Sequence, residues 1–121
     1  MKSELLHGTL EVMILKTLSW GPMHGYGIGR WIEQLGGETL RIDEGSLYPA
    51  LYRLERKEWI EAEWGLSEKK RRAKYYRLTK EGRAALKANA TQWTDFARAV
   101  GRVLGATEAP ASVLPPNKAK R

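Results

Sequence analysis

The chain has 121 residues, enough for one domain with a modest hydrophobic core. Its 21 Lys and Arg residues outnumber 14 Asp and Glu residues, and the formal charge of +7 favours polyanionic partners, nucleic acid before an anionic membrane surface. The absence of cysteine excludes disulfides and thiolate chemistry, and no apolar run approaches the roughly 20 residues of a membrane span. We expect a cytoplasmic protein with no membrane partner. A soluble protein whose basic charge has no partner fits the composition equally well, so the position of the charge along the chain must decide between these two interpretations.

Two helices are expected in the first third of the chain. Apolar residues three or four positions apart predict the first helix over Leu5–Leu18, and a Gly-Pro pair ends it. A second apolar stripe predicts another helix over Gly25–Leu35, which a Gly-Gly pair ends. Both helices should contribute to the core.

A third helix is expected after a short extended segment. The brief alternation of Thr39–Ile42 predicts a short strand. Asp43 is a favourable N-cap, and the helix that it begins is expected over Glu44–Lys57. Pro49 falls within the first turns of this helix, where its missing N–H does least harm if the helix begins near Ser46.

The second half of the chain predicts a hairpin and a long helix. Trp59–Trp64 and Ala73–Leu78 are expected to be antiparallel strands joined by the charged loop Gly65–Arg72. The last helix should begin near Thr79 and reach about Leu104. The remaining residues, 105–121, are rich in proline and poor in large apolar side chains, which predicts a disordered tail.

This order of elements predicts the fold class. The chain should be mainly α with a small β-hairpin (α+β), arranged as a winged helix-turn-helix with a long C-terminal dimerisation helix. Residues 1–78 would form the winged-helix DNA-binding domain, residues 79–104 the C-terminal dimerisation helix, and residues 105–121 the disordered tail.

The third helix is the candidate for reading DNA bases in the major groove. With its leucines facing inward, the opposite face presents short hydroxyls and aromatics near the N-terminus and arginines behind them. An ordinary amphipathic surface helix would normally display more Glu and Lys and fewer aromatics. The predicted contacts from this helix are Ser46, Tyr48, Pro49, Tyr52 and Arg53.

The hairpin loop concentrates basic side chains next to two tyrosines. Such a cluster is usually a solvated loop, but at the wing of a winged helix it can reach phosphates or the minor groove. The predicted DNA contacts from the wing are Lys70, Arg71, Arg72, Lys74 and Tyr76.

The last helix carries a heptad seam, which is typical of helix-on-helix packing. The residues before this helix form a domain too small to bury the whole apolar stripe, so we expect a homodimer. The stripe could also pack on the first helix of the same chain. The two arrangements are compatible. The predicted interface consists of Leu6, Leu10, Met13, Leu86, Ala90, Trp93, Ala97, Val100 and Leu104. Trp93 and Phe96 could simply pack there, or they could line a pocket for a small aromatic effector.

Catalytic interpretations find little support in the sequence. His7 and His24 are the only histidines, and neither has the spacing to a carboxylate that a metal site requires. His24, at the start of the second helix, is better interpreted as a structural hydrogen-bonding residue. We expect no enzyme activity, no metal and no cofactor.

Three segments together resemble PadR-type regulators, a family named for control of phenolic acid decarboxylase. They are Leu18–Tyr26 with the sequence LSWGPMHGY, Glu44–Glu55 with EGSLYPALYRLE, and Arg71–Thr79 with RRAKYYRLT followed by Gly82. The resemblance covers roughly residues 5–86 and its motifs are specific in combination. The chain is similar to the family's short branch, which has one C-terminal helix.

The resemblance implies a homodimeric winged-helix protein, usually a repressor, released from DNA by a small molecule where an effector is known. Matching positions would place Ser46, Tyr48, Pro49, Tyr52 and Arg53 on DNA from the helix, and Lys70, Arg72 and Lys74 from the wing. Tyr76 would support a phosphate contact or pack. In multidrug-binding relatives a tryptophan on the last helix stacks on planar ligands, and Trp93 lies in the comparable region.

The expected function is therefore a sequence-specific repressor that binds an inverted-repeat operator in double-stranded DNA as a homodimer. Two alternatives stay open at this point. One is a winged-helix module that binds a protein partner, and the other is a chemical sensor without operator binding.

Overall fold

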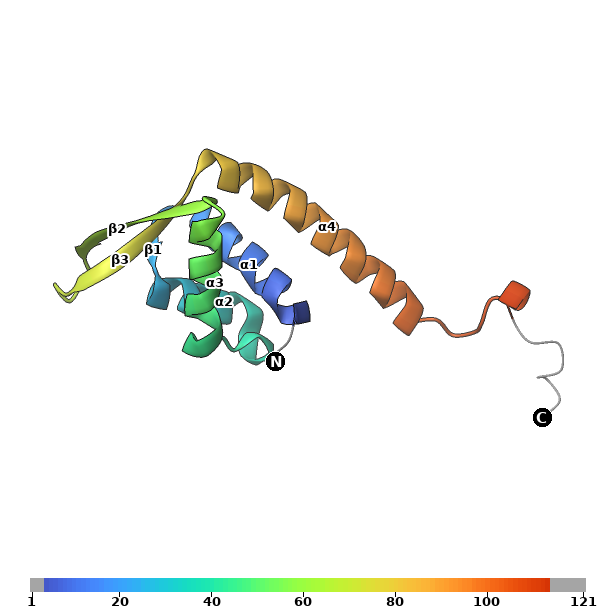
Figure 1. Ribbon diagram of the computed structural model, residues 1–121. Helices are drawn as coiled ribbons and strands as arrows, with labels where there is room; N and C mark the ends of the chain where they lie inside the picture. The colour runs from blue at the N-terminus through green and yellow to red at the C-terminus, as the bar shows by residue number, and fades with distance from the viewer. Residues whose placement is uncertain (1–3, 114–121) are drawn as a thin grey trace.

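The computed structural model describes residues 4–113, and it contains a helical head, a small sheet and one long helix (Figure 1). Figure 1 shows the hairpin of β2 and β3 extending to one side of the head, while α4 passes α1 and then projects away from it. The elements are α1 (Glu4–Leu18), β1 (Met23–His24), α2 (Gly25–Gly36), the 3-10 helix η1 (Gly37–Leu40), α3 (Glu44–Arg56), β2 (Ile60–Leu66), β3 (Arg72–Leu78), α4 (Lys80–Leu104) and the 3-10 helix η2 (Ala111–Val113). This mainly helical winged-helix arrangement confirms the predicted fold class.

The core lies where α1, α2 and α3 meet the base of the sheet. Its apolar residues come from the inward stripe of each helix and from the strand ends next to α4. Burial of these side chains is the main favourable contribution to folding. The buried apolar residues are Leu10, Ile14, Leu15, Leu18, Ile28, Ile32, Leu47, Ala50, Leu51, Leu54, Ile60, Tyr76 and Leu78.

Side chains cap the N-termini of three helices, which explains where these helices begin. The carboxylate of Asp43 accepts a hydrogen bond from the backbone N of Ser46 at 2.8 Å, and the Thr79 hydroxyl accepts from Gly82 N at 2.9 Å. His24 Nδ1 accepts from Gly27 N at 3.0 Å. The predicted structural role of His24 is therefore confirmed.

The sheet contains a strand that the sequence analysis missed. The strand order is β1-β3-β2, all antiparallel, with Met23 opposite Tyr76 on one side of β3 and Ala62 opposite Tyr76 on the other. Two residues are too few for a period-two pattern to be visible, so β1 gave no signal. It ties the entry of α2 directly to the hairpin.

The predicted strand at Thr39–Ile42 is wrong. The chain forms η1 there, and the backbone N of Ile42, which a strand would use for pairing, donates to the Glu33 carboxylate of α2 at 3.0 Å. The Leu40 side chain lies against Gly36 at the end of α2. Local contacts with α2 thus replace any strand partner.

The C-terminal part of the chain is described only in part. Residues 105–113 are exposed and include the single turn η2, and residues 114–121 of the predicted tail lie outside the described residues. The disorder predicted for residues 105–121 stays a prediction.

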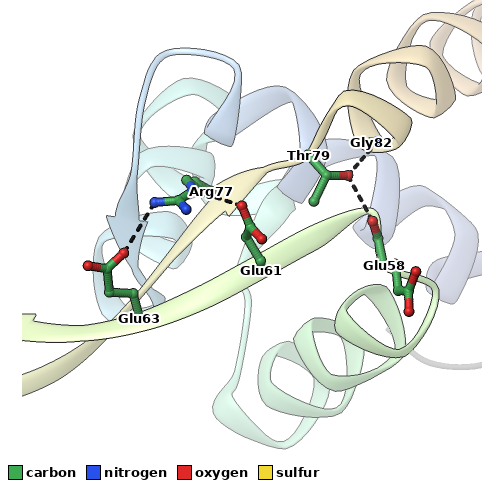
Figure 2. Close-up of polar contacts among 6 residues, drawn as sticks. All are labelled: Glu58, Glu61, Glu63, Arg77, Thr79 and Gly82. Atoms are coloured by element: carbon green, nitrogen blue, oxygen red, sulfur yellow. Dashed lines mark hydrogen bonds and ion pairs between the residues drawn. The ribbon is translucent and has the colours of Figure 1, made fainter.

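A tight corner joins the sheet to α4 (Figure 2). The Thr79 hydroxyl donates to the Glu58 carbonyl at 2.8 Å, and the Thr79 backbone N donates to the Trp59 carbonyl at 3.1 Å. Gly82, in the first turn of α4, lies so close to that same Trp59 carbonyl that a Cβ atom would overlap it. The corner therefore sets the direction in which α4 leaves the head.

We expect Gly82→Ala to destabilise the fold by roughly 1–3 kcal/mol, because the added methyl must displace the Trp59 backbone. Thermal or urea unfolding measures this change. Gly45→Ala, in the exposed first turn of α3 where a Cβ meets only ordinary contact, is the control and should leave stability unchanged or slightly raised. Equal stability of the two variants would contradict the close approach at the corner.

Candidate nucleic-acid interface

The face of α3 opposite its buried leucines is open to solvent and carries aromatic hydroxyls. Tyr48 is 44% exposed and Tyr52 is 59% exposed, with Pro49 exposed between them. Ser46 is half-buried beside the Asp43 cap. Arg56 lies 5.8 Å from the Tyr52 ring, close enough for a cation–π contact. Four of the five helix residues predicted to contact DNA therefore lie on or beside one accessible surface.

The fifth, Arg53, points toward α1. Its Nε donates to the Glu11 carboxylate at 2.6 Å, and Lys57 Nζ reaches the other oxygen of the same carboxylate at 3.0 Å. Arg53 lies on the flank of α3 that faces α1, about a third of a turn from Tyr52. The structure therefore does not bring Arg53 together with the exposed tyrosines as the sequence analysis expected.

Close packing of α2 against α3 fixes the position of Tyr48. A Cβ on Gly25 would lie 2.8 Å from the Tyr48 ring, so only glycine allows the ring to rest there. Partial burial of the phenol against α2 raises the pKa of Tyr48, with a smaller contribution from the nearby Glu44 carboxylate. The hydroxyl consequently stays protonated around neutral pH and can both donate and accept a hydrogen bond.

The wing loop is a tight turn that presents cations at the end of the hairpin. The backbone N of Ser67 donates to the Arg71 carbonyl at 2.8 Å, and the backbone N of Lys70 donates to the Ser67 carbonyl at 2.8 Å. Lys70 has a positive φ of 60°, which the turn requires. Lys70 and Arg71 have exposed side chains available to a phosphate.

The two remaining cations among the predicted wing contacts, Arg72 and Lys74, are engaged by other side chains. The Arg72 guanidinium lies 4.5 Å over the Trp64 ring, and Lys74 Nζ lies 3.5 Å from the Glu55 carboxylate of α3. The Lys74–Glu55 pair links the hairpin to α3. These contacts hold Arg72 against β2 and Lys74 against α3.

Tyr76 packs in the core. It is only 5% exposed, and its burial, together with the Glu55 carboxylate and Tyr48, raises the pKa of its phenol. Of the two roles that the resemblance implied for Tyr76, packing fits this burial, although its side chain also borders a cleft.

A cleft of about 950 Å³ runs between α2, α3 and the hairpin. Tyr26 and Arg30 of α2 form one wall, where Arg30 Nη1 donates to the Tyr26 hydroxyl at 2.9 Å. Trp64 of β2 forms part of another. These three residues could not be assigned to the site from the sequence, because their position on the cleft depends on how α2 and β2 pack. Trp64, at the end of the predicted strand Trp59–Trp64 and next to the charged loop, was a signal of this surface in the sequence.

Apolar side chains on α4 are left without cover in the single chain. Phe96 is 58% exposed, Val100 37% and Leu104 80%. Trp93 is 44% exposed and its indole N–H donates to the Thr9 hydroxyl of α1 at 3.0 Å. The distal half of α4 thus presents an apolar stripe, and its proximal half packs on α1 and the core.

The other predicted interface residues differ in exposure. Leu10 is fully buried in the core of its own chain, so its side chain cannot form a dimer surface, and we remove it from the set. Met13 and Leu86 are half-buried against the core. Ala90 and Ala97 are half-buried on α4, and the side chain of Leu6 lies outside the described residues.

A second cavity of about 460 Å³ lies between α1 and α4. Trp59, Trp93 and Phe96 supply aromatic walls, and Glu11 and Lys57 lie at its edge. Its size falls within the range of roughly 300–1,000 Å³ that small-molecule sites occupy. The structure therefore brings Trp93 and Phe96 together, as the effector-pocket interpretation requires.

Neither a metal-ion cluster nor a membrane-crossing helix is found in the described part of the chain. Residues 4–113 contain no group of three or more His, Cys, Asp or Glu side chains that could hold a metal ion. Within the same residues, no helix has the length and apolar character needed to cross a membrane.

The comparison with known proteins decides the family. Residues 14–88 match the model of the transcriptional regulator PadR-like family. The chain belongs to this family. As a PadR-like protein it is a winged-helix transcriptional regulator and not an enzyme, as the sequence analysis predicted.

Solved structures of other PadR-like proteins and regulators have the same fold. A transcriptional regulator from Clostridium thermocellum is 32% identical with a TM-score of 0.73, over 83% of this chain and 97% of that one. A PadR family regulator from Eggerthella lenta is 33% identical with a TM-score of 0.70, over 86% and 88%. A PadR-like regulator from Bacillus cereus is 30% identical with a TM-score of 0.71, over 86% and 99%.

Proposed function

We propose that this PadR-like regulator is a cytoplasmic repressor that binds an inverted-repeat operator as a homodimer. The observation that carries the proposal is the cleft between α2, α3 and the hairpin, which is lined by Tyr26, Arg30 and Tyr48 of the helices and by lysine and arginine residues of the hairpin. α3 would enter the major groove and the wing would contact the flanking phosphates. A partner protein would need no such combination of hydroxyls and cations, which favours DNA over the protein-interaction alternative.

The side chains of α3 and of the hairpin suit them to different contacts, α3 with bases and the hairpin with phosphates. Ser46, Tyr48 and Tyr52 offer neutral hydroxyls that can distinguish base edges, and Pro49 offers an apolar contact. Lys70, Arg71 and Arg72 offer positive charge that recognises any phosphate. Trp64, stacked under Arg72, would orient that guanidinium.

The exposed stripe of α4 supports dimerisation. Trp93, Val100 and Leu104 lie at heptad spacing, and pairing two such helices would bury apolar surface that one chain leaves in water. A two-fold dimer presents two reading helices about 34 Å apart, which matches half-sites one helical turn apart on DNA.

The aromatic cavity between α1 and α4 supports an effector site. A planar aromatic molecule resting on Trp93 and Phe96 would lie between the proposed dimer helix and the head, where it could alter their packing. Planar compounds should quench tryptophan fluorescence in the wild type, and Trp93→Leu should weaken both the quenching and the binding, because Trp59 is the tryptophan that then remains in the cavity.

Selection of bound fragments from the source genome identifies the operator, and Tyr52 then tests base reading. We expect Tyr52→Ala to lose about 1–3 kcal/mol of operator binding, with much less effect on random duplex DNA. Tyr52→Phe separates the hydroxyl from the ring. Equal losses on operator and random DNA would contradict base reading by α3.

The wing is tested by the salt dependence of binding to random duplex DNA. Replacing Lys70, Arg71 and Arg72 by alanine should reduce the slope of log affinity against log salt by roughly 0.9 for each phosphate that the variant no longer neutralises. A matched control replaces Lys80, Arg83 and Lys87, three exposed cations on α4, and should change the slope much less. An unchanged slope in the wing variant would remove the wing from the proposed interface.

Dimerisation is tested by a charge placed on the apolar stripe. In a two-fold dimer, Val100→Arg would place two unpaired cations between the helices at a cost of about 3 kcal/mol or more, which raises the dimer dissociation constant at least about a hundredfold. Thr91→Arg, on the opposite face of α4, is the control and should remain dimeric in light scattering at micromolar concentration. A monomeric wild type would contradict the proposed dimer.

A further inference from the structure

A cluster of one carboxylate and two cations lies on the side of α3 that faces α1. Glu11 of α1 uses both carboxylate oxygens, Oε2 for Arg53 Nε at 2.6 Å and Oε1 for Lys57 Nζ at 3.0 Å. The Glu11 side chain is only 12% exposed, whereas those of Arg53 and Lys57 are 34% and 45% exposed. The carboxylate is thus shielded behind the two cations.

The Arg53 guanidinium has one terminal nitrogen turned into the protein. Its Nη2 atom is buried, and among the described residues it has no hydrogen-bond partner. An arginine positioned for phosphate would present its terminal nitrogens to solvent, since bidentate contacts use them. Glu11 thus holds Arg53 in an orientation that does not favour a phosphate contact.

The pairing changes the charge that α3 offers to DNA. Three cations lie at the C-terminal end of this helix, namely Arg53, Arg56 and Lys57. Two of them share the Glu11 carboxylate, which leaves Arg56 as the cation without an acidic partner within the cluster. A phosphate must therefore compete with a carboxylate already in contact before it can recruit Arg53 or Lys57.

We propose that Glu11 is a specificity-determining residue that withholds Arg53 and Lys57 from the DNA backbone. Phosphate contacts add affinity for every sequence, whereas hydroxyl contacts from Tyr48 and Tyr52 depend on the bases. Glu11 suppresses phosphate contacts and leaves the hydroxyl contacts unchanged, and it thereby raises the ratio of operator affinity to random-DNA affinity. This inference rests on the proposed DNA-binding function.

The test compares Glu11→Gln with Glu61→Gln on random duplex DNA. Both substitutions change the net charge equally and weaken an arginine ion pair, but Glu61 lies with Arg77 on the sheet face opposite Tyr76. We expect E11Q to bind random DNA more tightly and with a steeper salt dependence, by roughly 0.9 in slope for each phosphate that a released cation neutralises. Between about 50 and 200 mM salt, the affinity of E11Q should then fall roughly threefold further than that of the wild type for each such phosphate. E61Q should behave as wild type.

Additional variants identify the released cations. Arg53→Gln with Lys57→Gln should leave the wild-type slope unchanged, and in the E11Q background the same two changes should cancel the increase. The double variant Arg53→Gln with Lys57→Gln also tests the inference if circular dichroism shows that E11Q is unstable. If this double variant, with Glu11 intact, has a lower salt slope than the wild type, the two cations already contact phosphate. That result would overturn the inference. The inference would also be overturned if E11Q is folded but binds random DNA with the same affinity and salt slope as E61Q, or more weakly. A wild type that ignores all duplex DNA would refute the proposed function itself, and the inference with it.

Discussion

The arrangement of the proposed interface depends on how α3 is held. Its buried stripe of Leu47, Leu51 and Leu54 packs into the core, so the opposite face must point to solvent. Contacts on both flanks then fix its rotation. Arg53 is tied to Glu11 of α1, and Glu55 to Lys74 of the hairpin. A helix constrained on three sides presents the same side chains each time it meets a ligand, which is the preorganisation that sequence discrimination requires.

The hairpin and α4 are coupled to that helix through short polypeptide connections. Trp59 follows α3 after two residues, and its carbonyl accepts from Thr79 and lies against Gly82 at the start of α4. The same corner therefore sets where the wing loop lies relative to α3 and where the apolar stripe of α4 is directed. In the proposed dimer, a change in how the α4 helices pack would alter the separation of the two reading helices. The aromatic cavity beside Trp93 lies between α4 and the head, where a ligand could produce such a change.

Most of the fold could be predicted from the sequence because its signals are local. Asp43 and Thr79 marked helix starts, and apolar spacing predicted the four α-helices of residues 4–113 to within a few residues. The errors came where tertiary contacts decide. β1 is two residues long and exists because β3 lies beside it, and at Thr39–Ile42 a hydrogen bond to the Glu33 carboxylate replaces strand pairing.

The candidate site was predicted less completely, for a related reason. Helical periodicity correctly indicated which side chains of α3 are exposed, but it cannot show what lies beside them. Arg53 is at the edge of the exposed face, and only the position of Glu11, 42 residues earlier, determines where its side chain goes. Tyr26, Arg30 and Trp64 join the cleft through the packing of α2 and β2, which no local pattern encodes.

The most direct test of this account is a hydroxyl-radical footprint on an operator fragment, with the number of bound chains measured on the same complex. Two chains should protect two symmetric half-sites, with major-groove centres about 34 Å apart and flanking protection from the wings. A single asymmetric protected region occupied by one chain would contradict the account.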